Sequence, residues 1–548
     1  MPWAGQGPAR KEDKMLRTIS PQEMKRVECR AMAERDVTGE ELMERAAGHV
    51  AAAVERRLAG KPGRVLCVCG TGNNGGDGIA AMRLLRRREP WRPVSLWLLE
   101  GTLSPDASLQ IRRLAEEAPD IAIEPIREGN GLPALPADTV CAVDAVFGTG
   151  LSRPVAGAAA DLCRLMEEAC TGGIPVVAVD IPSGLHGETG KVLGAVVRAT
   201  ETVTFHRPKT GLFLGAGPDL AGLVTVAPIG IAPEWDDAAG FWVAAEENVP
   251  AWFPPRPRDC HKGSFGRVLV LAGSRGMAGA AAICAMAALR TGAGLVRVAC
   301  PEEIVDVVQQ LCPCATCLPL PVGGAAEPLA DACAWADALA VGPGLGTGPD
   351  AKARVLQALA LLRNGGPKPA VLDADALNIL AQDGNAHGAA FAPCCVLTPH
   401  PAEAARLLDV SVQEVLGDPP GAARALQARF GASVVLKGAS SILVAGLEEG
   451  LNILGSPGMA KGGSGDALTG VLAALLARKR AASEDLLMDT QSAATNLPGP
   501  DVFLALQAGT ALHGLAGRAA AAAFGEWGMM ATDLCDQLGR VGGRYVRQ

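Results

Sequence analysis

The first half of the chain alternates between amphipathic and continuously apolar segments. Apolar positions recur with helical spacing over Glu40–Leu58, which predicts an amphipathic helix. Short apolar runs predict buried strands at Val65–Val68, Val94–Leu99, Val140–Phe147, Val176–Ile181 and Glu201–Phe205. Continuous apolar strands with helical segments between them are typical of a parallel, doubly wound sheet. The sequence therefore predicts an α/β fold for this half.

A second α/β alternation follows a proline-rich segment. Residues 249–259, VPAWFPPRPRD, break both the helical and the strand period, so we place a domain boundary near residue 245. Strands are predicted at Val268–Ala272, at Leu295–Ala299 and in the runs ending at Val341, Leu372, Leu397 and Leu436, and helices at Gly279–Arg290 and Asp466–Arg480. We expect a loose tail over 1–14, a first domain over 15–244 and a second over 245–548. Within the second, residues 481–500 are expected to form a surface loop or insertion, and the alanine run 519–523 a helix.

Composition narrows the class of protein. A chain of 548 residues is too long for one ordinary core, which agrees with two or more domains. The net charge of −8 and the lack of a basic run with aromatics argue against nucleic acid or a membrane surface as a partner. The N-terminus lacks the apolar core of a signal peptide, and no apolar run is long enough to span a bilayer. We therefore expect a cytoplasmic protein.

The sixteen cysteines are scattered through the predicted helices and strands. This distribution favours reduced thiols that pack as small apolar residues. The cluster Cys312, Cys314 and Cys317 contains a C-x-x-C spacing, for which a metal or redox role is the alternative.

A glycine-rich loop follows the first predicted strand. The stretch GTGNNGGDG, residues 70–78, contains G-x-G-x-x-G between a strand and a helix, the context of a Rossmann-like dinucleotide-binding turn. Gly72, Gly75 and Gly76 would allow the backbone to approach a phosphate closely. Two amides and a carboxylate, Asn73, Asn74 and Asp77, do not belong to a plain pyrophosphate turn and indicate a further role.

Two more strand ends carry polar residues, in DAVFGTGL (144–151) and DIPSGL (180–185). In a parallel sheet all three strand ends converge on one edge. Asn74, Asp144 and Ser183 could then offer oxygen ligands to a monovalent cation. Asp180 could act as an acid or a base. The alternative is that these residues only form turns and helix caps.

The strongest local signal in the second half is GMAKGGSGDALTG, residues 458–470. Glycines that open a helix leave free N–H groups at its positive end, which suits an anion such as phosphate. Asp466 at this helix end could take a proton from a substrate hydroxyl while the loop neutralises phosphate charge. The alternative is a glycine turn in which Asp466 is the N-cap.

The first-half motifs GTGNNGGDG, DAVFGTGL, DIPSGL and TVTFHRPKTGL occur in an order that resembles the NAD(P)HX epimerase family, also called the YjeF N-terminal domain, over about residues 15–225. The resemblance implies interconversion of the R and S forms of hydrated NADH or NADPH. It implies K⁺ at Asn74, Asp144 and Ser183, and catalysis by Asp180. The implied substrate contacts are Asn73, Asn74, Gly75, Gly76, Asp77, Gly148, Thr149, Gly150, Leu151, Ser152, Arg153, Pro154 and Asp180. Lys209 is either a further substrate contact or a solvated surface lysine.

The second half resembles the ribokinase-like NAD(P)HX dehydratases over about residues 245–540, through HKGSFGRVLVLAGS, VGPGLG, LDADALN, LTPHPAE, LKGASSIL and the Asp466 motif. The resemblance implies that Asp466 is catalytic. The implied contacts to the hydrated nucleotide are Ala280, Gly344, Gly346, His400 and Asp466. The implied contacts to ADP are Lys437, Gly438, Ala439, Ser440, Ser441 and Gly465. A lone histidine such as His400 is otherwise more often a structural residue.

Together the two resemblances imply a repair enzyme. One domain would epimerise R- and S-NAD(P)HX, and the other would dehydrate the S form to NAD(P)H with ADP, releasing AMP and phosphate. Phosphoryl transfer normally recruits Mg²⁺. We also expect a homo-oligomer with small-molecule substrates. The competing hypotheses are a vitamin or sugar kinase in the second half and a non-catalytic binding module in the first.

Overall fold

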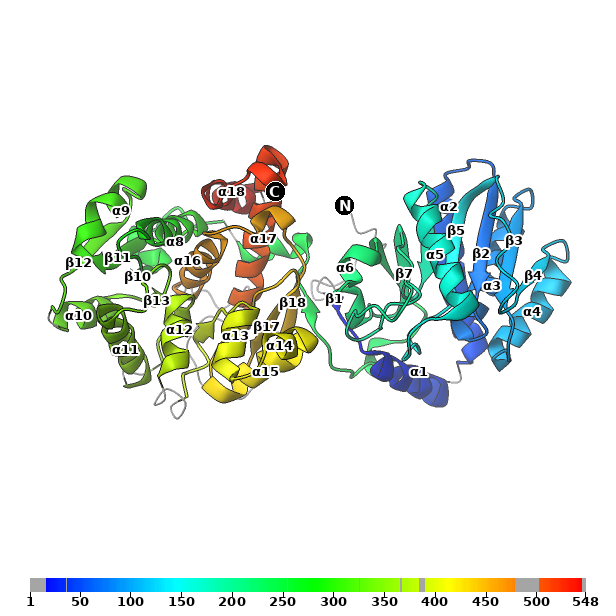
Figure 1. Cartoon of the computed structure of the whole chain (residues 1–548), viewed down its shortest axis with the longest axis horizontal. Helices are drawn as coiled ribbons and strands as arrows, with labels where there is room; N and C mark the ends of the chain where they lie inside the picture. The colour runs from blue at the N-terminus through cyan, green and yellow to red at the C-terminus, as the bar shows by residue number, and fades with distance from the viewer. Residues whose placement is uncertain are drawn as a thin grey trace. The chain divides into compact units, whose positions relative to one another are not determined.

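The structure is a computed structural model that describes residues 16–35, 37–253, 255–324, 326–364, 367–383, 390–478 and 502–544. It divides into two compact units, residues 1–242 and 243–548 (Figure 1). The predicted tail over 1–14 and the predicted insertion over 481–500 lie outside the described residues.

The first unit is a seven-stranded parallel sheet in the order β4-β3-β2-β5-β6-β7-β8. Its elements are β1 (Leu16–Arg17), α1 (Pro21–Arg35), α2 (Gly39–Leu58), β2 (Arg64–Cys69), α3 (Asn73–Arg88), β3 (Val94–Leu99), α4 (Pro105–Glu117), β4 (Ile123–Ile126), β5 (Thr139–Ala145), α5 (Gly157–Thr171), β6 (Val176–Val179), β7 (Glu201–Phe205), α6 (Gly217–Leu220) and β8 (Leu223–Ala227). The predicted parallel, doubly wound sheet is confirmed.

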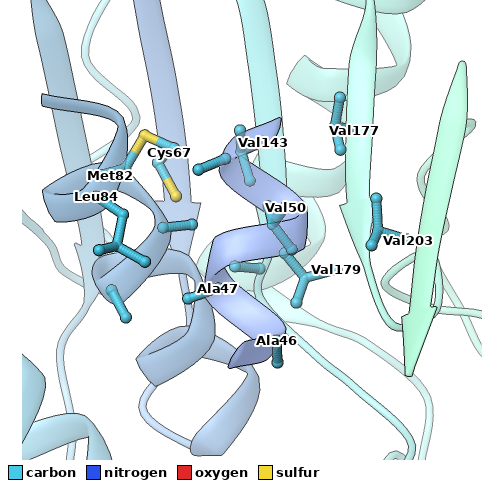
Figure 2. Packing of buried hydrophobic residues seen from close by; sticks show 14 of the residues in the cluster. Ala46, Ala47, Val50, Cys67, Met82, Leu84, Val143, Val177, Val179 and Val203 are labelled. Atoms are coloured by element: carbon cyan, nitrogen blue, oxygen red, sulfur yellow. The ribbon is translucent and has the colours of Figure 1, made fainter. Parts of the chain in front are cut away.

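Helices cover both faces of this sheet because its strands are apolar on both sides. On one face Ala46, Ala47 and Val50 of α2 pack against Val143 of β5 and Val179 of β6 (Figure 2). On the other face α5 packs against β2 and β5 through a second cluster that includes Leu162, Met166, Leu66 and Ala142. With both faces buried, the edge at the strand ends is the part of the sheet that remains available for a ligand.

The second unit has a sheet in which β18-β17-β16-β15-β14-β13-β10-β11-β12 lie in that order. Neighbouring strands from β16 to β12 are parallel, whereas β17 and β18 form an antiparallel hairpin with β16. The strands are β10 (Arg267–Leu271), β11 (Leu295–Pro301), β12 (Thr316–Leu320), β13 (Ala338–Val341), β14 (Ala370–Leu372), β15 (Cys395–Leu397), β16 (Ser433–Leu436), β17 (Ser441–Ala445) and β18 (Glu448–Asn452), and β9 (Trp242–Val243) precedes them in the chain.

The helices of this half are α7 (Val249–Trp252), α8 (Ala278–Thr291), α9 (Val305–Leu311), α10 (Glu327–Trp335), α11 (Pro349–Asn364), α12 (Asp375–Gln382), α13 (Pro401–Leu408), α14 (Val412–Gly417), α15 (Pro419–Phe430), α16 (Ser464–Leu476), α17 (Val502–Gly528) and α18 (Ala531–Arg544). α16 packs tightly on α8 (Figure 1). Any Cβ at Gly470 of α16 would lie 2.1 Å from the carbonyl oxygen of Cys284 of α8, so only glycine fits there. This close contact fixes the start of α16 relative to the sheet.

The differences from the sequence prediction lie at element ends and in strands that were not predicted, among them β4, β8, β12 and the hairpin. The helix predicted over Asp466–Arg480 spans Ser464–Leu476, so it begins two residues earlier and ends four residues before the predicted end. The alanine run 519–523 is helical within α17, as predicted. The antiparallel pair β17–β18 was not predicted, because it departs from the alternation of strand and helix that organises the rest of the unit.

Candidate active sites

In the first unit the glycine-rich loop lies at the point where the sheet order reverses. β2 pairs with β3 on one side and with β5 on the other. From β2 the chain adds β3 and β4 on one side of the sheet, and from β5 it adds β6, β7 and β8 on the other. In doubly wound folds this reversal opens a crevice for ligands at the strand ends. The loop passes so close to itself that a Cβ at Gly75 would lie 1.9 Å from the carbonyl oxygen of Gly70. Glycine is therefore required where α3 begins.

The three oxygen donors expected for K⁺ belong to one connected group. Ser183 donates from N to Oδ2 of Asp144 at 2.7 Å and from Oγ to Oδ1 at 2.6 Å. The Phe147 amide donates to Ser183 Oγ at 2.8 Å. The adjacent residue, Gly148, contacts Asn74, since a Cβ there would lie 3.0 Å from Asn74 Oδ1. The Asp144, Ser183 and Asn74 side chains thus surround the loop that follows β5.

Two features of this group fit a cation. Burial raises the pKa of Asp144 to about 6, although hydrogen bonds from Ser183 and Val146 oppose the rise. Asn74 Oδ1, a neutral oxygen of the kind that binds K⁺, lies beside Gly148 in the loop after β5. A bound cation would stabilise the buried carboxylate and orient the Asn74 amide, and one carboxylate with neutral oxygens suits a monovalent ion.

Asp180 and Lys209 form a buried ion pair at the neighbouring strand ends. Lys209 Nζ lies 2.6 Å from Asp180 Oδ1, and the residues are 1% and 8% exposed. Asp180 Oδ1 also accepts hydrogen bonds from Thr204 Oγ1 and the Phe205 amide. The interpretation of Lys209 as a solvated surface lysine is therefore wrong. Asp180 has a φ of 64°, a conformation uncommon outside glycine and often found at functional sites.

Two further carboxyl groups, those of Asp77 and Glu28, interact electrostatically with this ion pair. Burial raises the pKa of Asp77 in α3 well above its usual value, and the negative charges of Asp180 and Glu28 add to the rise. Burial also raises the pKa of Glu28 in α1, while Lys209 partly offsets it. Sequence reasoning missed Glu28. The one signal for it is the bridge between Ile19 and Lys209, a tertiary contact that places the start of α1 beside the lysine.

The other residues expected to contact substrate line the same edge. Asn73 donates from Nδ2 to Asp106 Oδ2 of α4 at 3.2 Å, which fixes its side chain. The segment Gly148, Thr149, Gly150, Leu151, Ser152, Arg153 and Pro154 is partly or fully exposed. It connects β5 to the start of α5 and is open to a ligand.

In the second unit the ends of five neighbouring parallel strands, β10, β13, β14, β15 and β16, share one edge. The order reverses between β10 and β13, and the loops after these strands bind each other. Gly273 N donates to Pro343 O, and Ser274 Oγ donates to Gly344 O, both at 2.8 Å. A Cβ at Gly344 would lie 2.8 Å from the Cβ of Ala280. Ala280, Gly344 and Gly346 thus gather at the reversal.

Lys437 directly follows β16, the last of these five strands, and its side chain reaches Asp373 at the end of β14. Its Nζ donates to Asp373 Oδ1 at 2.6 Å and lies 3.9 Å from Glu403 Oε2. Burial lowers the pKa of Lys437, but the negative charges of Asp373, Glu403 and Asp466 outweigh this effect and leave the pKa raised. The segment 437–441 forms the turn between β16 and β17, with Gly438 and Ala439 exposed. A permanently charged ammonium beside an open turn suits the phosphates of a nucleotide.

Asp466 lies in the first turn of α16, beside the Lys437 ammonium. The N-cap of α16 is Gly463 in the left-handed conformation, so the interpretation of Asp466 as the N-cap is wrong. A Cβ at Gly465 would lie 3.5 Å from Lys437 Nζ, which brings the positive helix end and the ammonium together. Burial raises the pKa of Asp466 to about 6, and the negative charge of Asp373 adds to the rise. A pKa near neutrality suits a general base.

His400 has a structural role. It is the N-cap of α13, and its Nδ1 accepts hydrogen bonds from the amides of Ala402 and Glu403. Its Nε2 lies 3.4 Å from Glu403 Oε1, and because the side chain is 47% exposed, part of the ring is still accessible to a ligand.

Sequence reasoning missed Asp373 and Asp375, although their motif LDADALN was singled out. Asp373 is 1% exposed and binds Lys437, while Asp375 Oδ2 accepts from the Gly346 amide at 2.7 Å. The sequence did contain one signal for them. A carboxylate directly after a buried strand needs a hydrogen-bond donor or a cation beside it, which indicates a polar site.

The remaining chemistry-bearing residues form no further centre. Within the described ranges, no three His, Cys, Asp or Glu side chains gather as a metal-binding group, so the metal alternative for the Cys312–Cys317 cluster has no support. All sixteen cysteines are free. Among the described helices, none has the length and apolar character needed to cross a bilayer.

Two family models match the chain. Residues 39–211 match the YjeF-related protein N-terminus, and residues 268–540 match NAD(P)H-hydrate dehydratase. The bifunctional NAD(P)H-hydrate repair enzyme of Moorella thermoacetica is 35% identical over 539 residues, which cover 95% of each chain. The enzyme of that name from Escherichia coli is 35% identical over 492 residues, covering 87% of this chain and 84% of the relative. The ADP/ATP-dependent NAD(P)H-hydrate dehydratase of Bacillus subtilis, a solved structure, is 27% identical, covers 55% of this chain and 97% of its own, and gives a TM-score of 0.44.

Proposed function

This chain belongs to the family of bifunctional NAD(P)H-hydrate repair enzymes. We propose that the carboxyl ends of the parallel strands in its two sheets form two active centres of one repair reaction. The first unit epimerises R- and S-NAD(P)HX, and the second dehydrates S-NAD(P)HX to NAD(P)H. We assign these activities to residues 15–244 and 245–548. The observation that carries the proposal is a buried ion pair at the strand ends of each sheet, Asp180 with Lys209 and Asp373 with Lys437. Each pair lies close to the point where the strand order reverses.

In the first centre we propose that Asp180 is the base and Asp77 the acid. Epimerisation breaks the carbon–oxygen bond at the hydroxyl-bearing ring carbon as Asp77 gives a proton to the departing oxygen, which leaves as water. A water then adds to the other face of that carbon while Asp180 takes its proton. Lys209 stabilises the Asp180 carboxylate that accepts a proton. The raised pKa of Asp77 keeps a proton available for the departing oxygen. A carboxyl group with a raised pKa near a carboxylate paired with lysine is a common acid–base arrangement.

We propose that K⁺ is held by Asn74, Asp144 and Ser183. The buried Asp144 carboxylate and the neutral oxygens of Asn74 and Ser183 beside the same loop support this assignment. When bound, the ion supplies fixed positive charge beside the substrate loops. Its protein ligands connect the loop after β2 to the loop after β5, and they therefore order both sides of the crevice.

In the second centre we propose that Asp466 accepts the proton of the substrate hydroxyl while that oxygen takes a phosphoryl group from ADP. AMP is the leaving group. The resulting phosphate ester then eliminates, because phosphate leaves the ring carbon far more readily than hydroxide does. A proton departs from the neighbouring carbon, which restores the ring double bond. Lys437 and the amides at the start of α16 hold the phosphates.

Mg²⁺ is the metal we propose for this centre. It neutralises phosphate charge when bound and would arrive with the nucleotide, since Mg²⁺ commonly keeps several waters and uses substrate phosphates as ligands. The lack of a three-residue metal group among the described residues fits this mode of binding.

The test is a repair assay with the purified chain, both epimers of hydrated NADH, K⁺, Mg²⁺ and either ADP or ATP. We expect dihydronicotinamide absorbance to return fully with ADP. Recovery that stops when the S form is consumed would leave the first centre without epimerase activity. If a stable phosphorylated alcohol accumulates and absorbance does not return, the second unit is a kinase and the repair proposal is wrong.

We further propose a cytoplasmic homo-oligomer without nucleic-acid or membrane partners. The sixteen free thiols and the net charge of −8 support this. Large apolar side chains exposed near the junction of α17 and α18, Phe524, Trp527 and Met530, support self-association. Sedimentation of the purified chain tests the oligomeric state.

A further inference from the structure

The segment between β14 and α12 contains an unusual backbone conformation. Ala374 has φ 48° and ψ −116°, which a residue with a side chain rarely adopts. Of the other described non-glycine residues with positive φ, Ala59 and Asp409 terminate helices, and Asp180 and His206 lie in the first unit. Ala374 separates two aspartates, Asp373 and Asp375, and the conformation directs them to different partners.

Asp373 binds on the nucleotide side of the edge. Its Oδ1 accepts from Lys437 Nζ at 2.6 Å, and its Oδ2 accepts from Thr469 Oγ1 of α16 at 2.8 Å. Both oxygens are therefore occupied by protein groups, and the residue is 1% exposed. Asp373 cannot touch a ligand directly. It links the ammonium at the end of β16 to the helix that carries Asp466.

Asp375 binds on the other side. Its Oδ2 accepts from the Gly346 amide at 2.7 Å, and its Oδ1 accepts from Asn378 Nδ2 at 3.3 Å. Gly346 has a φ of 72° and belongs to the loop after β13, which also contains Gly344 and contacts Ala280. This carboxylate thus fixes the loop at the sheet reversal, and the Lys437 ammonium pairs with Asp373 and Glu403 instead.

We propose that Asp373 and Asp375 are the two positioning residues of the second centre, and that each serves a different ligand. Asp373 aims Lys437 at the phosphates of the nucleotide donor. Asp375 shapes the Gly344–Gly346 loop that contacts the hydrated nucleotide. The strained backbone of Ala374 lets one short turn direct the two carboxylates to these different partners. This inference rests on the proposed function for the identity of the two ligands.

The test compares Asp373→Asn and Asp375→Asn in the full chain, with Asp331→Asn on the exposed surface of α10 as the matched control. Calorimetry measures binding of ADP alone and of S-NADHX alone, and steady-state assays give both KM values. A lost hydrogen bond to a charged group corresponds to a change of about 10-fold or more. We expect Asp373→Asn to weaken ADP binding by that factor and leave hydrate binding unchanged. We expect Asp375→Asn to do the reverse.

A double-mutant cycle shows whether Asp373 acts through the lysine. Because its role is to aim Lys437, Asp373→Asn should weaken ADP binding no further in a Lys437→Met background. Removal of the Asp373 charge should also move the acidic limb of the kcat/KM profile to lower pH, since that charge raises the pKa of Asp466. A merely structural role would not produce this shift.

Three results overturn the proposal: equal loss of both ligands in both variants, additive losses in the cycle, or a lowered melting temperature with unchanged binding. The calorimetric binding measurements distinguish a failure of this inference from a failure of the proposed function. If the wild-type chain binds both ligands but forms no NADH, the proposed function fails and the positioning roles are still measured. If it binds neither ligand, both are wrong.

Discussion

The ammonium of Lys209 lies 2.6 Å from the Asp180 carboxylate, and the lysine is 1% exposed. A buried lysine loses its hydration and retains its charge only beside compensating groups. Here the carbonyl oxygen of Phe205 is a further acceptor, 2.9 Å from Nζ. The pair therefore fixes the carboxylate at the end of β6 in one position, facing the crevice of the first centre.

Replacement of Lys209 by Met should abolish epimerisation while the second centre continues to dehydrate S-NADHX. The substitution leaves the Asp180 carboxylate buried without its cation, and breaking a buried pair costs about 3–5 kcal/mol. Epimerisation is measured by the rate at which pure R-NADHX becomes available for repair, and stability by denaturant unfolding. Lys191→Met, at an exposed position of the same unit, is the control and should change neither. Unimpaired epimerisation in Lys209→Met would show that the ion pair has no part in catalysis.

K⁺ should stabilise the first unit, and more strongly at pH 8 than at pH 5. The pKa of Asp144 is about 6 in the folded chain, above its unfolded value, so the folded state binds more protons between about pH 4 and 6. The free energy of unfolding therefore falls by up to about 3 kcal/mol as pH rises through this window. A cation that binds the ionised carboxylate offsets the loss above pH 6. Thermal unfolding with K⁺ or with a bulky organic cation measures the difference.

Asp144→Asn removes the buried charge and is the control for the cation experiment. Its melting temperature should no longer depend on K⁺, and its stability should vary less between pH 4 and 6. A K⁺ effect of equal size in this variant would place the ion elsewhere.

Dehydration should require an ionised Asp466. Because burial raises the pKa of this carboxyl to about 6, kcat/KM for S-NADHX should increase with pH and level off above that value. Asp466→Asn should lower kcat by about 10²-fold or more, the usual contribution of a general base. ADP binding should persist in this variant because the lysine and the helix amides remain. A pH-independent rate between pH 5 and 7 would exclude Asp466 as the base.

His513 of α17 should make the second unit sensitive to acid. Its Nε2 donates to Ser464 O at the start of α16, at 2.9 Å, and burial lowers its pKa to about 4. The unfolded chain binds a proton near pH 6.5 and the folded chain does not, so stability is lost as pH falls from about 6.5 to 4. The loss is about 3 kcal/mol. His513→Gln should make the free energy of unfolding less dependent on pH between about 4 and 6.5. Urea unfolding, monitored by the loss of dehydratase activity, measures this dependence, and an unchanged pH dependence would contradict the assignment.

The sequence was sufficient for most strands and for the order of the first-unit motifs, but it did not reveal β4, β8, β12 or the hairpin β17–β18. Continuous apolar runs can be satisfied only by a sheet buried on both faces, and parallel strands bring Asn74, Asp144 and Asp180 to one edge. Their roles as ligands and base remain proposals, because apolar periodicity determines position and not chemistry.

The partners of buried charges could not be predicted. Asp373 and Lys437 are 64 residues apart, and Asp180 and Lys209 are 29 apart. No local pattern distinguishes a lysine that ends in the core from one that ends in solvent, since the difference depends on the tertiary fold. The same limit concealed Glu28, whose helix reaches the site through the contact between Ile19 and Lys209.

The phosphate-binding parts of the second centre come from separate places in the chain. Lys437 begins the turn between β16 and β17, whereas Asp466 is carried by α16, which starts only after β18 and the loop that follows it. Substitutions within the turn can therefore change which nucleotide is accepted while the acid–base group and its helix stay as they are. If the turn binds the nucleotide as proposed, changes confined to this one hairpin would be sufficient to exchange the phosphoryl donor.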